Sequence, residues 1–174
     1  EAMKAFALMD GVWRGPAWTI MRSGEKHHIT QTERIGPFLD GSIKVIEGRG
    51  YNADGNVSFN AMGIISYDTA KKTYTMHSHA QGRVGDFVIK PTADGYVWEI
   101  PAGPATIRYT AVIKNETLHE VGDRIVAGTW AFAAAMTRLF SRPVMQPITD
   151  LTRTAEHIEA TGDLGRRMGA RGTD

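Results

Sequence analysis

Three polar side chains that alternate along one predicted strand carry the most specific chemistry in the sequence. Glu47, Arg49 and Tyr51 occupy every second position, so on a strand they share one face, with about 6 to 7 Å between successive side chains. A guanidinium beside a phenol can bind a ligand carboxylate through paired, charge-assisted hydrogen bonds. The alternative is an internal ion pair of Arg49 with Glu47 or with Glu33 that is simply structural. Both interpretations stay open.

Motifs for catalysis are sparse. Glu33 and Glu47 could act as an acid–base pair if the fold brought them together. The sequence has no serine in a strained elbow with a nearby histidine, and the glycines at positions 48 and 50 do not belong to a phosphate-binding loop that leads into a helix. We therefore predict no catalytic residue, and an enzyme of isomerase or hydrolase type is the alternative to ligand binding.

Two histidines have the spacing of metal ligands. His77 and His79 would lie on one face of a strand, where a third ligand from a neighbouring strand could complete a site. The other face carries Tyr74 and Met76, which suit the interior better, so we predict that both imidazoles point into solvent. A haem site needs an inward histidine in an apolar pocket, so haem is disfavoured. We predict no metal and no cofactor.

The aromatic residues are typical of core packing, and some of them would also line a cavity. We include Phe59 and Trp98 among the predicted ligand contacts, beside the polar group. Trp13 stands between Gly11 and Gly15 at the head of the first strand, where we predict a structural role for all three.

Composition excludes several classes of function. The 174 residues suit one domain with a sizeable core, since 42% of them are hydrophobic and 22% are charged. The net charge of +1 argues against a nucleic-acid partner, which normally requires a large basic excess. No apolar run approaches the roughly 20 residues of a membrane span. The absence of cysteine removes disulfides and thiolate chemistry.

The middle of the chain consists of short segments rich in β-branched and aromatic residues, separated by turn-forming Gly, Asp and Asn. This pattern predicts antiparallel strands near residues 12–21, 27–35, 41–51, 56–67, 73–80, 85–90, 96–100, 105–114 and 117–126. No long helices alternate with the strands, so the pattern favours an up-and-down barrel or a sandwich.

Alternation assigns a face to each strand. In the strand at 41–51 the face with Ile43 and Val45 is the more apolar, so we predict that this face, with Glu47, Arg49 and Tyr51, points inward. By the same criterion, the strand at 105–114 turns the face with Tyr109 inward and leaves Arg108 outside.

The two ends of the chain differ from the middle. Helical spacing predicts a short lead-in helix over residues 1–9. Residues 129–139 fit either a closing strand or a helix. The pattern indicates a short helix after Pro147 and then a Gly- and Arg-rich tail, so the C-terminal part is predicted to be partly helical or disordered. We predict a barrel domain over residues 1–140 and an extension over residues 141–174.

Six short runs of residues support a family resemblance. They are DGVWRG (10–15), TQTERIGPFLDG (30–41), IEGRGY (46–51), ISYD (65–68), GDF (85–87) and RYT (108–110). Together they resemble the bacterial DUF1579 family over about residues 3–126. That family is lipocalin-like, so the resemblance implies a calycin β-barrel of about 9–10 strands with an internal cavity, in which Trp13 closes one end.

The function predicted from these observations is binding of a small, partly apolar ligand inside the barrel, with an anionic head near Arg49. A structural or interaction module with a filled barrel is a second alternative. A homodimer is compatible with this interpretation. The chain starts at Glu1, which suits either a cytoplasmic bacterial protein or one whose signal peptide has been removed for the periplasm or export, so the compartment stays open.

Overall fold

Over the residues that the structure describes, the fold is all-β apart from one short N-terminal helix. A computed structural model describes residues 1–21, 23–126 and 134–141, the last range by its backbone alone. Its elements are the 3-10 helix η1 (Ala2–Met9) and the strands β1 (Gly11–Ile20), β2 (Lys26–Phe38), β3 (Ile43–Tyr51), β4 (Val57–Asp68), β5 (Thr73–Ala80), β6 (Arg83–Thr92), β7 (Gly95–Ala102), β8 (Ala105–Lys114), β9 (Thr117–Val126) and β10 (Ala134–Ser141).

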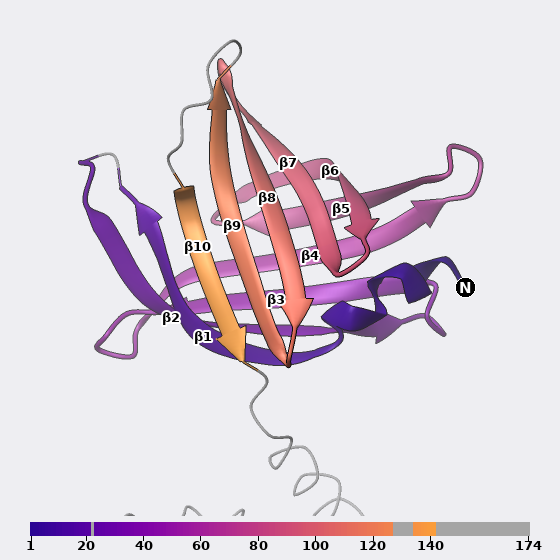
Figure 1. Ribbon diagram of the computed structural model, residues 1–174, viewed down its shortest axis with the longest axis horizontal. Helices are drawn as coiled ribbons and strands as arrows, with labels where there is room; N and C mark the ends of the chain where they lie inside the picture. The colour runs from indigo at the N-terminus through magenta and orange to yellow at the C-terminus, as the bar shows by residue number, and fades with distance from the viewer. Residues whose placement is uncertain (22, 127–133, 142–174) are drawn as a thin grey trace, which may run out of the picture. The chain divides into compact units, whose positions relative to one another are not determined.

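The strands form one closed antiparallel barrel. Each strand pairs with its neighbours in sequence, and β10 pairs with both β9 and β1 to complete the circle. Figure 1 shows β7, β8 and β9 crossing the direction of β3 and β4, as expected for a strongly twisted sheet that closes on itself. The prediction of an all-β, up-and-down barrel of about 9–10 strands with a short N-terminal helix is confirmed.

Two tight turns show why the sequence forms hairpins. Ala80 pairs with Arg83 across the β5–β6 turn, and the two residues between them, Gln81 and Gly82, have φ values of 51° and 76°. The β8–β9 turn repeats this arrangement, with φ values of 49° and 58° at its two central residues. Positive φ at both central positions is the type I′ geometry that matches the twist of antiparallel strands.

One end of the barrel is closed by η1. Its apolar residues Met3, Phe6 and Met9 are buried, as helical spacing predicted, although the helix is of the 3-10 type. Trp13 lies in the same core and has no exposed surface. The predicted structural role of Trp13 therefore agrees with its burial at this end.

The closing strand resolves one open alternative. Residues 129–139 fitted a strand or a helix, and the structure places a strand over residues 134–141, paired with β1 through Ala17 and Arg138. The predicted C-terminal extension lies outside the described residues, apart from Ser141 at the end of β10. Among the described residues, no helix has the length and hydropathy of a membrane-spanning segment.

The ladder between β6 and β7 is the shortest of the hairpin ladders. These strands pair only over the segment nearest their turn, from Thr92 with Gly95 to Ile89 with Trp98. Beyond that point β6 continues its pairing with β5, and β7 continues its pairing with β8. The described strands β6 and β7 therefore diverge beyond the pair of Ile89 and Trp98.

Candidate functional site

The predicted polar ligand group lies on the outside of the barrel. In β3 the buried positions are Lys44, Gly48 and Gly50, and the alternate positions with Glu47 and Arg49 point outward. The Arg49 side chain is 52% exposed and that of Glu47 is 36% exposed. Tyr51 lines an outer pocket together with Glu47 and Arg49, so the prediction that these three residues face the interior is wrong.

Packing explains the inversion of β3. A Cβ atom at Gly50 would stand 2.6 Å from Cδ1 of Ile29 and 3.0 Å from Cβ of Phe59, so no larger side chain fits there without a shift. A Cβ atom at Gly48 would meet Phe59 at 3.8 Å. The two glycines face inward because neighbouring side chains occupy the space above them.

Lys44 is the second reason for this orientation. Its side chain is almost fully buried, which is costly for a lone ammonium group. The ammonium forms an ion pair with Asp10, the residue that joins η1 to β1. A lysine with such a partner can occupy an inward position that hydrophobicity alone would assign to solvent.

The inner face carries buried polar groups on β2, β7 and β9. Gln31 Nε2 donates a 2.9 Å hydrogen bond to Glu33 Oε1, and both residues are buried. The hydroxyl of Tyr96 donates a 3.0 Å hydrogen bond to Glu120 Oε2, also within the core. The sequence placed Glu33 among the ligand contacts but not Glu120, although Glu120 shares the inward parity of the buried Leu118.

The inner face also carries the aromatic residues predicted to contact a ligand. Trp98 stacks on Tyr109 with ring centroids 4.4 Å apart and an angle of 13° between the rings. Phe87 of β6 lies 5.6 Å from Trp98 in a tilted arrangement. Phe59 packs over the two inward glycines of β3. Phe59, Phe87 and Trp98 are half-buried although they point inward.

The six predicted ligand contacts do not form one site. Glu33, Phe59 and Trp98 lie on the inner face, and the wall of the barrel separates them from the outward group on β3. The outward group forms its own cluster, in which Glu47 pairs with Arg49 at 2.8 Å and with Arg34 at 3.5 Å. The structural ion pair of Glu47 with Arg49 is therefore present, but it lies outside the barrel and not inside as predicted, and Arg34 is a further partner.

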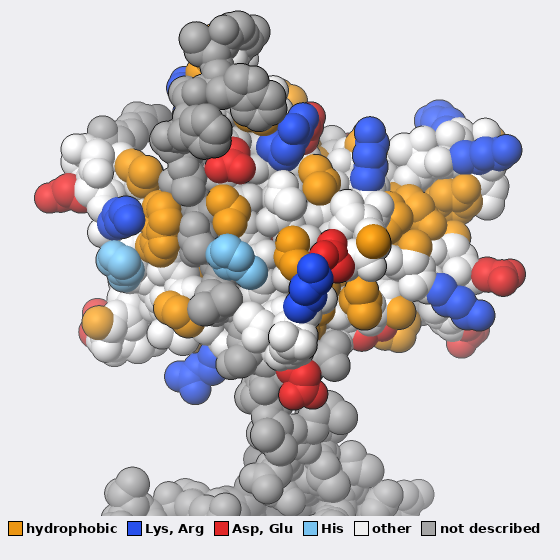
Figure 2. Space-filling view, viewed as in Figure 1, with side chains coloured by type: hydrophobic (Ala, Val, Ile, Leu, Met, Phe, Trp, Pro, Cys, Tyr) orange, Lys and Arg blue, Asp and Glu red, His pale blue; other side chains and the backbone are white. Residues whose placement is uncertain are grey.

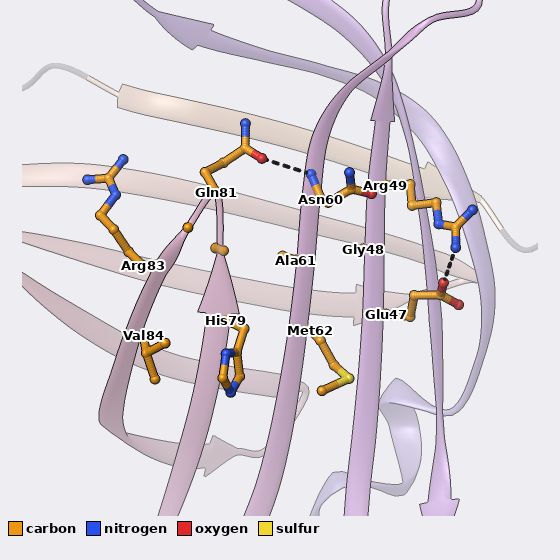
Figure 3. Close-up of a pocket in the computed structure, with 12 residues that line it drawn as sticks. Glu47, Gly48, Arg49, Asn60, Ala61, Met62, His79, Gln81, Arg83 and Val84 are labelled. Carbon is orange, nitrogen blue, oxygen red and sulfur yellow. Dashed lines mark hydrogen bonds and ion pairs between the residues drawn. The ribbon is translucent and has the colours of Figure 1, made fainter.

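A shallow groove of about 440 Å³ crosses the outer face of β3, β4, β5 and β6. Figure 3 shows Arg49, Asn60 and Gln81 at one end of this groove and His79 between Met62 and Val84 further along it. A smaller pocket of about 250 Å³, lined by Thr32, Arg34, Glu47, Arg49 and Tyr51, adjoins it. The outer face therefore offers polar and basic groups at one end and apolar groups at the other.

Gln81 has a structural role in this groove that sequence reasoning did not identify. Strand β4 extends beyond the end of β5, and Gln81 caps its edge there. The Gln81 side chain accepts a hydrogen bond from the Asn60 main-chain N–H and donates one to the Ser58 carbonyl. These bonds replace the ladder that a longer β5 would make, so they protect the edge of β4 from pairing with another chain.

His77 and His79 point outward from β5, as predicted. His77 Nδ1 lies 2.6 Å from Asp86 Oδ1 on β6, and the two imidazole rings are 4.9 Å apart. Within the part of the chain that the structure describes, no three His, Cys, Asp or Glu side chains are arranged to hold a metal ion together.

Three described carboxylates with a lowered pKa lie in turns or next to one. The main-chain N–H of Asn56 holds the pKa of Asp54 below its ordinary value, and the N–H of Lys71 does the same for Asp68. A side-chain hydrogen bond from Lys114 lowers the pKa of Asp94. All three carboxylates are exposed at least in part and bond to their own turns or ladders, so these shifts report turn geometry rather than acid–base chemistry at a site.

Charge on the surface is mixed. Figure 2 shows acidic, basic and apolar side chains of the described residues interspersed over one face. This distribution agrees with the net charge of +1.

No protein-family model matches the chain, and no curated protein matches it significantly.

Proposed function

We propose that this protein binds a small, partly apolar ligand against the inner face of its barrel. The observation that carries the proposal is the pair Phe87 and Trp98, whose rings point inward and yet remain partly exposed. They stand where the ladder between β6 and β7 ends. Partial exposure on an inner face means that solvent reaches these rings, and a small molecule can displace that solvent favourably.

The aromatic groups define the chemistry of the ligand. The stacked pair of Trp98 and Tyr109 presents a flat apolar surface, and Phe87 adds an inclined wall beside it. Such walls favour a planar or alkyl ligand that contacts ring faces. Glu33 and Phe59 are further proposed contacts on the same inner face. Arg49 is not part of this proposal, because it lies outside the barrel.

The sequence runs that resemble a known family support a second, compatible proposal. We propose that the chain is a lipocalin-like member of the DUF1579 family, on the strength of the sequence runs that resemble it. The closed ten-strand barrel and the buried Trp13 are compatible with that assignment. A barrel with one closed end suits the binding of small apolar molecules.

The test is a titration with N-phenyl-1-naphthylamine, a neutral, flat aromatic fluorophore. We expect saturable binding with increased probe fluorescence, and we expect Trp98→Ala to weaken it about tenfold or more through loss of ring contact. Val88→Ala is the matched control, because Val88 follows Phe87 in β6 and points outward.

Trp98→Phe separates loss of the site from loss of the fold. It keeps an aromatic ring at the position, so the variant should retain most of the affinity. The proposal fails if the wild-type protein shows no saturable binding, or if Trp98→Ala and Val88→Ala weaken the probe equally.

A further inference from the structure

We propose that His77 and His79 chelate a divalent transition-metal ion on the outer face of β5, with Asp86 as a positioning residue. This site is independent of the inner face. The two histidines occupy alternate positions of one strand and are exposed. Their ring centroids are 4.9 Å apart and the rings are inclined at 74°.

The hydrogen bond to Asp86 prepares His77 for coordination. Asp86 Oδ1 lies 2.6 Å from Nδ1 of His77, across the β5–β6 ladder. A carboxylate accepts a hydrogen bond, so in the neutral imidazole the proton resides on Nδ1 and the lone pair on Nε2 is available. Histidines that bind metals almost always have such a partner on the other ring nitrogen, which fixes the tautomer and the ring orientation.

The distance between the rings suits one shared ion. Bonds of about 2.0–2.1 Å from a metal to each nitrogen would place the two nitrogens roughly 3.3 Å apart in tetrahedral geometry. The exposed ring of His79 reaches that separation by rotation about its side-chain bonds, while His77 keeps its hydrogen bond to Asp86.

The neighbouring strands leave the site accessible and place mainly apolar side chains opposite the two histidines. His79 is opposite Met62 on β4 and Val84 on β6, and Figure 3 shows it between these two side chains. His77 is opposite Ile64 on β4, so apart from Asp86 its cross-strand neighbours are apolar. Arg83 also lines the groove beside His79.

The donor set selects the class of metal. Imidazole nitrogens suit Zn²⁺, Ni²⁺ and Cu²⁺, and the order of affinities among these ions places Cu²⁺ highest. The described residues supply two nitrogen ligands and no group of three, so water completes the coordination sphere. The site should therefore be open and of moderate affinity.

Isothermal titration of the full chain with ZnCl₂ and NiCl₂ tests the proposal. We expect one ion bound per chain at this site, and His77→Asn or His79→Asn should each weaken binding at least tenfold. His119→Asn is the matched control, because His119 is an exposed histidine on β9 and carries no imidazole two positions away. Equal affinity in the wild-type protein and His79→Asn, or an equal loss in His119→Asn, would overturn the proposal.

Nitrogen NMR of the imidazole rings tests the role of Asp86 separately. In the wild-type protein the proton of neutral His77 should be on Nδ1, and Zn²⁺ should shift the Nε2 resonances of His77 and His79. Asp86→Asn should remove the tautomer preference and weaken Zn²⁺ binding about tenfold, the low end of the effect of such partners. A wild-type His77 with its proton on Nε2 would contradict the role of Asp86.

Discussion

The indole of Trp13 and the main chain of Met9 are joined by a hydrogen bond of 2.7 Å from Nε1 to the carbonyl oxygen. The bond is buried and spans the corner between η1 and β1. It fixes the helix against the first strand at the closed end of the barrel, where Met9 and Trp13 belong to one apolar core.

Trp13→Phe should lower the free energy of unfolding by roughly 1–3 kcal/mol, because the Met9 carbonyl loses a donor inside the core. Urea unfolding followed by circular dichroism measures the change. Trp18→Phe is the control, since Trp18 is only half-buried and its ring lies under the exposed Lys26 ammonium at 4.2 Å. A larger effect at Trp18 than at Trp13 would contradict the account of the closed end.

Gly11 has a backbone conformation that other residues rarely adopt, with φ at 140°. Gly11→Ala should therefore destabilise the protein by roughly 1–3 kcal/mol. Gly36→Ala is the comparison, because a Cβ atom at Gly36 meets nothing within 4 Å. Thermal unfolding of the two variants should show a clear drop only for Gly11→Ala, and similar midpoints would count against a special role for Gly11. Gly15, which was predicted to be structural together with Gly11, pairs with Gln31 within the β1–β2 ladder.

Asp10→Asn should destabilise the fold by roughly 1–3 kcal/mol, since it leaves the buried Lys44 ammonium without a charged partner. The partial exposure of Asp10 keeps the loss below that of a fully buried pair. The double variant Asp10→Asn with Lys44→Met should recover much of the stability in chemical denaturation, because the buried charge is gone. No recovery would show that the ion pair itself stabilises the corner.

Arg49→Ala should leave the affinity for the naphthylamine probe unchanged, since Arg49 points away from the inner face. Fluorescence titration beside Trp98→Ala makes the comparison within one experiment. A loss of affinity in Arg49→Ala similar to that in Trp98→Ala would place the ligand on the outer face instead.

Asp68 should contribute stability that depends on pH in the acid range. Its pKa is lowered in the folded protein, chiefly by the Lys71 main-chain N–H at 3.0 Å, with a second bond from Ala70 at 2.9 Å. The stabilisation is therefore fully present above the ordinary pKa of about 3.9 and is lost as pH falls through the lower folded value. Carbon NMR of the side-chain carboxyl should give a midpoint below 3.9, and a midpoint at or above it would contradict the turn geometry.

Alternation and turn chemistry were sufficient to predict the strands β1 to β9, while the segment of β10 fitted either a strand or a helix. Each predicted segment matches one of the strands β1 to β9, because β-branched runs end at residues such as Asn115 that accept positive φ. Residue parity also placed Arg108 and His77 outside and Tyr109 inside, as the structure shows. These assignments depend on local chemistry alone.

The face of β3 could not be predicted by the same method. Counting apolar residues favours the face with Ile43 and Val45, but Gly50 lies inward because Ile29 and Phe59 occupy the space above it. Both contacts come from other strands and are invisible in the β3 sequence. Lys44 misleads for a related reason, since its partner Asp10 is 34 residues away in the chain.

Ligand binding and homodimer formation could not be predicted from strand alternation or turn chemistry, because each involves a second molecule. The predicted contacts Glu33, Phe59 and Trp98 share the inner face, which makes a common ligand geometrically reasonable. The homodimer stays a prediction.

The pairing of β1 with β10 also has a kinetic consequence. Arg14 pairs with Ser141, so the last ladder joins residues separated by most of the barrel sequence. Closing such a long loop costs conformational entropy before the stabilising contacts of the ladder have formed. Folds dominated by pairings between distant residues therefore reach the native state slowly. Until that ladder forms, both β1 and β9 present open edges. The folding chain is therefore most prone to self-association just before the barrel closes.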